Sequence, residues 1–335
     1  WPRSQHSLSL SGGSARSNYR VSADYRSANG IDLYSGREEY GARVALNHTA
    51  KGGLITFSLN VAPRVAYRKN ASWDVFRNAV EANPTTPIMD PKDPSLYYNF
   101  KGQAAGYNPL ELLKKDKSTG TTKLLDWDGT VKLNLLPLLL NKEDRQTLTT
   151  QLTFADHQYD NYNQWFRPST STLAINAGRE GEASQDYSKS AIRTLEWVTN
   201  YANSFGNHNF KVMAGYSYQY EQYSGLNAAN KDFPNDALED NNLGSGTYAK
   251  DEGELGMGSY KNDSKLISFF GRVSYDWKGR YMLTASLRHE GSSKFGEHHK
   301  WGNFPAISAG WRISDEAFMA GTKSWLTDLK LRGDF

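Results

Sequence analysis

Four side chains in the C-terminal part of the sequence are of the types that bind metal ions: His289, Glu297, His298 and His299. Helical zinc sites space their histidines so that two rings lie on one face of the helix. Adjacent histidines in a loop do not have this spacing. We therefore expect a solvated loop here and predict no metal site.

An acidic stretch of the sequence is rich in the oxygen ligands that calcium prefers. Its carboxylates are Asp232, Asp236, Glu239 and Asp240. The stretch has neither the ligand spacing nor the central glycine of an EF-hand loop, so a solvated loop is the interpretation that we favour over a calcium site. No Gly-x-Ser-x-Gly motif marks a catalytic nucleophile. The sequence thus predicts neither an enzyme nor a cofactor.

Clusters of aromatic and amide side chains are better suited to bind a ligand. Flat aromatic rings beside Asp and Asn suit sugars, which present apolar C–H faces and hydroxyl edges, but packing within loops or contact with a partner protein explains the same clusters equally well. The candidate binding residues, all expected in external loops, are Trp73, Tyr97, Tyr98, Asp160, Asn161, Tyr162, Asn163 and Trp165. Helical spacing of Trp73, Phe76 and Val80 also predicts a short amphipathic helix within residues 71–81, buried in its own loop.

The elements that carry these residues show a period of two, which is the pattern of strands with one apolar and one polar face. Tyr19, Val21, Ala23 and Tyr25, for example, alternate with Arg20, Ser22, Asp24 and Arg26. About twelve such runs occur, near residues 4–12, 17–27, 39–50, 53–68, 128–136, 146–159, 191–204, 209–224, 266–277, 281–291, 303–313 and 329–335. Many of these runs reach the ~9–11 residues that a tilted strand needs to cross a bilayer.

The connections between the runs alternate between short and long. Short or medium connections are expected at residues 12–16, 50–53, 137–145, 206–209, 278–280 and 314–328, and long ones at 28–38, 70–125, 168–189, 225–265 and 292–302. In strand order the two kinds fall on opposite ends of the sheet, as in outer-membrane barrels with short periplasmic turns and long external loops. Aromatic residues at both ends of the runs suit the two membrane interfaces.

Composition excludes several other classes of protein. The 39 Lys and Arg residues nearly balance the 36 Asp and Glu residues, and the net charge of +3 is too small for a nucleic-acid binder. The absence of cysteine removes disulfides and thiolate metal sites. The longest apolar run is interrupted by Pro137, so no membrane-spanning helix is predicted.

One segment resembles the SusC/RagA family of TonB-dependent outer-membrane transporters. The residues that carry this resemblance are Gly291, Ser292, Ser293, Phe295, Gly296, Trp301, Gly302, Phe304, Pro305, Gly310, Trp311 and Arg312. Residues 7–19, 83–91 and 329–333 are also similar to the family, so the resemblance extends over most of the chain.

The sequence and the resemblance together predict an all-β fold, an antiparallel transmembrane β-barrel. The chain is expected to supply about twelve strands of this larger barrel. Polar residues such as Arg20, Asp24, Arg26, Arg43, Asn47 and Asn60 are expected to line its lumen. The barrel is expected to contact outer-membrane lipid, and the plug domain, the TonB-contacting segment and the C-terminal strands are expected outside residues 1–335.

The resemblance implies import of an oligosaccharide, or of a peptide, across the outer membrane. It also implies two partners, a SusD-like surface lipoprotein over the external loops and the TonB-ExbB-ExbD complex. A soluble or surface-exposed all-β carbohydrate-binding module or adhesin is the alternative, because alternation alone does not show whether an apolar face meets lipid or a second sheet.

Overall fold

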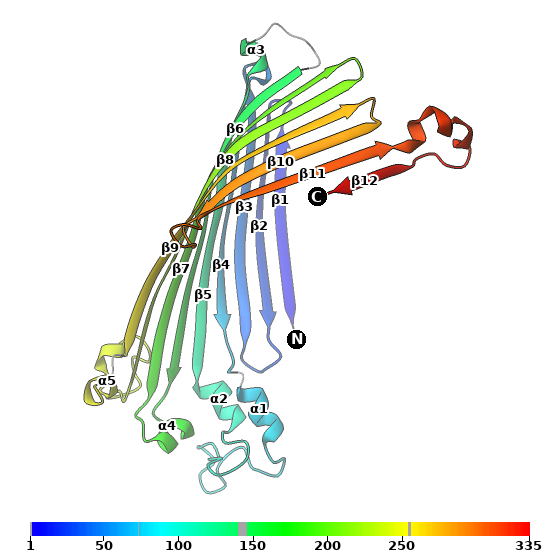
Figure 1. The fold of residues 1–335 in the computed structure, drawn as a ribbon. Helices are drawn as coiled ribbons and strands as arrows, with labels where there is room; N and C mark the ends of the chain where they lie inside the picture. Colours follow the sequence, from blue (N-terminus) through cyan, green and yellow to red (C-terminus); the bar gives the residue numbers. More distant parts are fainter. Residues whose placement is uncertain (1, 73, 140–145, 254–255) are drawn as a thin grey trace.

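Twelve strands form one antiparallel sheet, in which each strand pairs with the next along the chain. The computed structural model describes residues 2–72, 74–139, 146–253 and 256–335 (Figure 1). The strands are β1 (Arg3–Gly13), β2 (Ser17–Asn29), β3 (Gly36–Ala50), β4 (Ile55–Lys69), β5 (Lys117–Asn134), β6 (Gln146–Arg167), β7 (Glu182–Phe205), β8 (His208–Lys231), β9 (Met257–Trp277), β10 (Tyr281–Ser292), β11 (Trp301–Arg312) and β12 (Lys330–Asp334). The predicted fold class and strand order are therefore confirmed.

In the part of the chain that the structure describes, helices occur only in the connections. They are α1 (Asp74–Glu81), α2 (Pro109–Lys115), α3 (Leu136–Leu139), α4 (Thr172–Ala177) and α5 (Tyr248–Asp251), with 3-10 turns η1 (Lys51–Gly53), η2 (Leu243–Ser245), η3 (Ile313–Asp315) and η4 (Ala317–Thr322). In the described part of the chain, no helix has both the length and the apolar character needed to cross a membrane.

The connections sort by length as predicted. The long ones that carry α1, α2, α4 and α5 gather at one end of the sheet, whereas α3 lies at the opposite end (Figure 1). Tight turns join β7 to β8 and β9 to β10 at the end where α3 lies. By the rule for outer-membrane barrels, the end with long loops is extracellular and the end with tight turns is periplasmic.

The strand register gives the sheet one apolar and one polar face. Tyr19 lies opposite Leu46, which lies opposite Leu59, whereas the neighbouring polar residue Asn60 lies opposite Ala45, which lies opposite Arg20. This register places the predicted lumenal residues on one common face. That face is the lumenal one, because the other carries the apolar belt.

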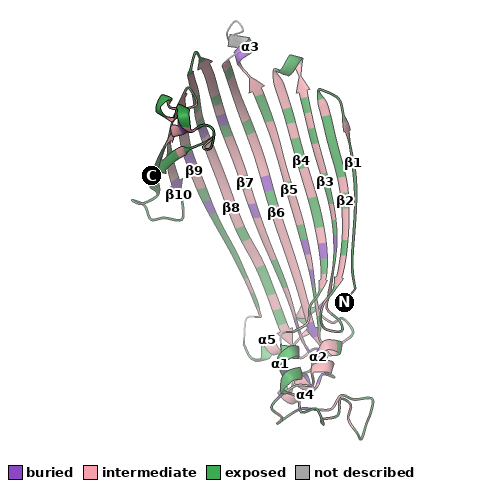
Figure 2. Cartoon of the chain, turned by 90° about the vertical axis from the view of Figure 1, so that its right-hand side faces the viewer, coloured by how far each residue is buried: buried purple, intermediate pink, exposed green. Residues whose placement is uncertain are grey.

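Large apolar side chains on the outer face remain exposed in the isolated sheet. Leu152 is 49% exposed and Phe269 is 51% exposed, and few strand residues are buried (Figure 2). A sandwich would cover this face with a second sheet, and the described residues form a single sheet. The outer face is instead suited to lipid, so the structure does not support the soluble alternative.

Aromatic residues form rows at both ends of the outer face. At the periplasmic end, ring centroids lie 4.7 Å apart for Phe210 and Tyr275 and 5.5 Å apart for Trp277 and Tyr281. At the extracellular end, Tyr25 and Tyr40 lie 5.0 Å apart, and Tyr40 lies 6.4 Å from Tyr67. Such rows are typical of the two interfaces of a membrane barrel.

Strands β5 to β9 extend further toward the extracellular end than the sequence predicts. The expected runs at 146–159 and 191–204, for example, belong to strands at Gln146–Arg167 and Glu182–Phe205. Polar residues lie on both faces of these extensions: Asp160 pairs with Lys189 on the outer face, and Asn161 contacts Arg68 on the lumenal face. Alternation of apolar and polar residues therefore stops at the edge of the membrane although the strands continue.

The segment that carries the family resemblance forms the β10–β11 hairpin. A side chain added at Gly291 would lie 2.6 Å from the Trp301 ring, so glycine is needed for this close approach. Trp301 in turn stacks on His289 with ring centroids 4.6 Å apart. The spacing of small and aromatic residues in this segment thus has a packing explanation within the hairpin.

Candidate functional site

Tyr97 and Tyr98 lie in the loop between β4 and β5, as predicted. Both are half-buried. The Tyr98 ring lies edge-on to Phe100, with 6.1 Å between centroids, and the Lys115 ammonium lies 5.5 Å from the centre of the Tyr97 ring. These contacts show that the two tyrosine rings pack within the loop itself.

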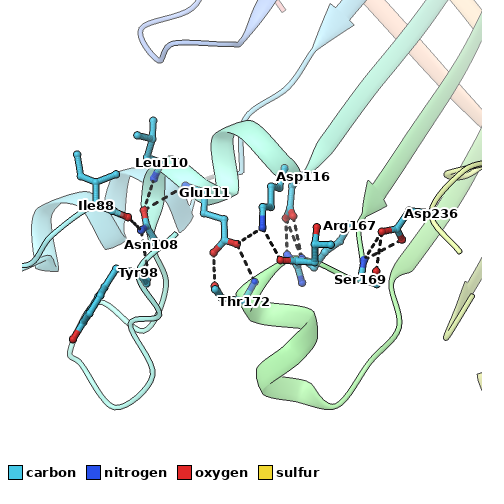
Figure 3. A network of polar contacts seen from close by, with 12 residues as sticks. Ile88, Tyr98, Asn108, Leu110, Glu111, Asp116, Arg167, Ser169, Thr172 and Asp236 are labelled. Atoms are coloured by element: carbon cyan, nitrogen blue, oxygen red, sulfur yellow. Dashed lines mark hydrogen bonds and ion pairs between the residues drawn. The ribbon is translucent and has the colours of Figure 1, made fainter. Parts of the chain in front are cut away.

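Asn108 holds this loop together. Its side-chain amide donates to the carbonyl oxygens of Ile88 (2.8 Å) and Tyr98 (3.3 Å). Its Oδ1 atom accepts from the backbone N–H groups of Leu110 (3.2 Å) and Glu111 (3.4 Å), so the same side chain caps the N-terminus of α2. One buried amide thus fixes both the tyrosine segment and the helix (Figure 3).

We expect Asn108→Ala to destabilise this loop locally by about 1–2 kcal/mol, because it removes a helix cap and two further hydrogen bonds. Hydrogen exchange of the Leu110 and Glu111 amides in the full-length protein measures the effect. Asn83→Ala is the matched control, since Asn83 serves only an exposed turn through the Thr85 N–H at 3.0 Å. Equal exchange in the two variants would contradict the prediction.

The candidate residues at 160–165 lie in strand β6, so their expected placement in an external loop is wrong. Successive side chains of a β-strand point to opposite faces of the sheet. The register places Asn161, Asn163 and Trp165 on the lumenal face, whereas Asp160 and Tyr162 lie on the outer face. The six-residue stretch therefore does not form one cluster, and its lumenal half is the better candidate for contact with a ligand.

The lumenal amides of β6 belong to a polar network. Arg68 donates to Asn161 Oδ1 at 2.7 Å and to Asn163 Oδ1 at 3.1 Å, and the Thr122 hydroxyl donates to Asn161 at 3.0 Å. The Trp165 ring lies 5.0 Å from the Arg167 guanidinium. The network joins β4, β5 and β6 at the extracellular mouth, where polar and aromatic groups lie side by side.

Three long loops interlock above this mouth (Figure 3). Buried Glu111 in the loop after β4 accepts from the Thr172 backbone N–H at 3.0 Å and from the Thr172 hydroxyl in the loop after β6. Asp236 in the loop after β8 accepts from the Ser169 backbone N–H at 3.0 Å and from its hydroxyl at 2.8 Å. The loops therefore form one connected unit.

Arg167 is the charged centre of this unit. It binds Asp116 through two nitrogens, the closer at 2.6 Å, and Glu182 at 3.2 Å. The side chains of Arg167 and Asp116 are only 19% and 9% exposed. Burial raises the pKa of Asp116 above its ordinary value, and the Arg167 hydrogen bonds oppose that shift.

The loop helix predicted within residues 71–81 is present as α1, but its buried face differs from the prediction. Val75 and Asn78 are buried, whereas Val80 is 88% exposed. Trp73, a candidate binding residue, lies outside the described residues.

The residues considered as metal ligands do not lie together in the structure. The described residues contain no group of three or more His, Asp or Glu side chains placed to hold a metal ion. The four carboxylates Asp232, Asp236, Glu239 and Asp240 contact four separate partners, which are Arg179, Ser169, Lys117 and Gln164 respectively. Asp232 and Asp236 join one loop to another, Glu239 and Asp240 join a loop to a strand, and the four do not converge on a shared centre.

A single antiparallel sheet with an apolar outer face, a polar inner face, aromatic rows at both interfaces and long loops at one end is the wall of an outer-membrane β-barrel. Comparison with known proteins agrees with this class. The chain is 27% identical over 337 residues to TonB-dependent receptor P3 of Formosa agariphila, and the alignment covers 98% of this chain and 32% of the relative. It is 26% identical over 362 residues to TonB-dependent receptor SusC of Bacteroides thetaiotaomicron, which covers 98% of this chain and 32% of SusC.

Among solved structures, the RagAB peptide transporter has the same fold, with a TM-score of 0.75, 17% identity and coverage of 99% of this chain and 36% of that one. No protein-family model matches the chain. The chain spans about a third of the length of the curated relatives it matches. The resemblance to SusC/RagA transporters is confirmed over nearly the whole chain, and these relatives are receptors, not enzymes.

Proposed function

We propose that this chain forms the barrel wall of a TonB-dependent importer that carries a nutrient across the outer membrane. The observation that supports the proposal most strongly is the similarity of nearly the whole chain to TonB-dependent receptors, SusC among them. Import of this kind is binding and release without a covalent step. It agrees with a wall whose lumenal face is polar.

The proposed nutrient is an oligosaccharide, with a peptide as the second candidate. Tyr97, Tyr98, Asn161, Asn163 and Trp165 supply the aromatic and amide groups for such a ligand at the mouth of the barrel. The proposed roles of Asp160 and Tyr162 are weaker, because both lie on the outer face. Trp73 is proposed as a further ligand contact from its sequence alone. The peptide alternative is supported by the structural likeness to a peptide transporter.

A SusD-like surface lipoprotein is the proposed partner at the extracellular loops. The interlocked loops support this role, because a fixed surface is better able to seat a partner than separately moving segments. The TonB-ExbB-ExbD complex is proposed to act from the periplasm through a plug and a TonB-contacting segment that are not among residues 1–335.

The test combines uptake with isolation of the complex. Cells that lack the gene, or that are treated with a protonophore, are expected to lose uptake of labelled oligosaccharides that the parent strain imports. Native mass spectrometry of the protein extracted in mild detergent is expected to show a bound lipoprotein. Unchanged uptake in the deletion strain would contradict the import function, and a protein recovered without detergent would contradict the membrane location.

A further inference from the structure

Arginines occur at five successive levels of the lumenal face of β2, β3 and β4, from Arg20 near the periplasmic end of β2 to Arg37 and Arg68 at the mouth. The strand register aligns lumenal residues of β2, β3 and β4 in five rows across the sheet, which we call levels. Neighbouring levels are two residues apart along each strand. Arg20 lies on the first level, Arg43 on the second, Arg64 on the third, Arg26 on the fourth, and Arg37 opposite Arg68 on the fifth. We call these six residues the arginine ladder. Four steps of two residues span about 27 Å along the strands.

Half of the ladder has no partner in the wall. The side chains of Arg20, Arg26 and Arg43 are exposed and form no hydrogen bond or ion pair with any residue that the structure describes. Because their guanidinium groups remain fully charged at any physiological pH, these three positions hold uncompensated positive charge inside the lumen.

The other half of the ladder is only partly neutralised. Arg64 pairs with Glu39 at 3.1 Å and with Asp24 at 3.9 Å, and Arg37 shares Glu39 at 2.6 Å. Arg68 is held by the neutral amides of β6. Six guanidinium groups therefore face two carboxylates.

A hollow of about 390 Å³ opens between these side chains on the lumenal face. It is lined by Arg20, Arg43 and Arg64, together with smaller residues and the carboxylates of Asp24 and Asp126. Two of its three arginines are those without a partner, so the hollow offers free guanidinium groups in a partly enclosed space.

The adjoining wall lacks this excess of positive charge. On the lumenal face of β5 to β8, six carboxylates outnumber four basic side chains: Asp126, Asp128, Glu182, Asp186, Glu196 and Glu221 against Lys132, Arg167, Lys211 and Lys231. A negatively charged ligand is therefore attracted more strongly to β2 to β4 than to β5 to β8.

We propose that the arginine ladder binds an anionic nutrient, an oligosaccharide or peptide that carries carboxylate or sulfate groups along its length. Guanidinium groups bind both of these oxyanions through paired hydrogen bonds, which lysine does not reproduce. Successive levels about 6.7 Å apart allow one extended ligand to meet several arginines at once. This inference rests on the proposed import function and names the charge of its substrate.

The test uses the full-length protein in detergent and a short dextran oligosaccharide in neutral, carboxymethylated and sulfated forms, with binding measured by titration calorimetry. Both charged forms are expected to bind at least about tenfold more tightly than the neutral form, with an affinity that falls as salt is added. The double variant Arg20→Gln, Arg43→Gln is expected to lose about tenfold of that affinity. Because neither arginine has a partner in the wall, the variant leaves no buried carboxylate unpaired.

Arg272→Gln is the matched control, since Arg272 lies on the lumenal face of β9 outside the ladder. Equal binding of the charged and neutral dextrans would overturn the inference, as would equal losses in the control and the double variant. A double variant that melts at a lower temperature but keeps its affinity would also overturn it, and would show that the ladder holds an acidic segment of the protein itself. Binding in detergent needs no energy from TonB, so these outcomes are independent of the uptake test.

Discussion

Arg167→Met is expected to release the interlocked extracellular loops, at a cost of about 3 kcal/mol. The substitution keeps an unbranched apolar stem but leaves the buried Asp116 without its bidentate partner, and removal of one member of a buried ion pair is strongly destabilising. Hydrogen exchange of residues 111–116 and 168–181 in the full-length protein measures the effect. We expect protection in both segments to fall together, because Glu111 and Thr172 join them.

The same variant has a predictable pH dependence. A carboxyl whose pKa is raised on folding favours the folded state below its ordinary pKa and opposes it as the pH rises through the raised value. Burial raises the pKa of Asp116, so the loss of protection is expected to be smaller in mildly acidic buffer than at pH 8. A defect that is constant with pH would show that the buried charge is not its cause.

Arg77→Met is the control for this prediction. Arg77 also pairs with an aspartate, Asp74 at 3.2 Å, but the two side chains are 61% and 54% exposed. Surface pairs of this kind contribute about 0–1 kcal/mol. If Arg77→Met reduced loop protection as much as Arg167→Met, the central place of Arg167 would be contradicted.

Leu152→Lys is expected to destabilise the barrel by about 2–4 kcal/mol, because a lysine on the lipid face near the middle of the bilayer loses its hydration. Leu152 is 49% exposed on the outer face of β6, between the periplasmic end of the strand and the first outer carboxylate, Asp156. The measurement is the amount of folded full-length protein in the outer-membrane fraction, judged by its heat-dependent mobility in detergent gels.

Gln151→Lys is the control one residue away. Strand geometry turns residue 151 toward the lumen, where water solvates an added ammonium group. We expect this variant to assemble as the parent does. Equal assembly of Leu152→Lys and Gln151→Lys would show that the apolar face does not meet lipid, and would contradict the assigned inside and outside of the wall.

Period-two alternation marks the strands of this protein only between the two membrane interfaces. Between the two interfaces, alternation identified the strands and their faces, because one face meets lipid and the other meets water. Beyond the extracellular interface both faces are polar, as Asp160 and Asn161 on β6 illustrate. The pattern disappears there, and residues 160–165 were expected in a loop although backbone pairing continues to Arg167.

The candidate site shows the same limit. Tyr97 and Tyr98 could be placed in a loop from the sequence, but not their packing on Phe100 and beneath Lys115, since those contacts depend on how the loop folds back. The roles of Asn108 and Arg167 were missed. Asn108-Pro109 before an apolar run is a recognisable helix start, whereas the pairing of Arg167 with Asp116 crosses 51 positions of sequence and leaves no local signal.

The sequence by itself determined the class of this protein: alternating strands, sorted connections and the Gly291–Arg312 segment identify an outer-membrane barrel wall that resembles the SusC/RagA transporters. Only the tertiary structure decided which side chains act together. Arg20, Arg43 and Arg64 are far apart in sequence and become successive levels of one ladder through the register of β2, β3 and β4. The physical reason is that the lipid imposes a local, periodic pattern on each strand, whereas the lumen and the loops depend on neighbours brought together by hydrogen-bonded pairing.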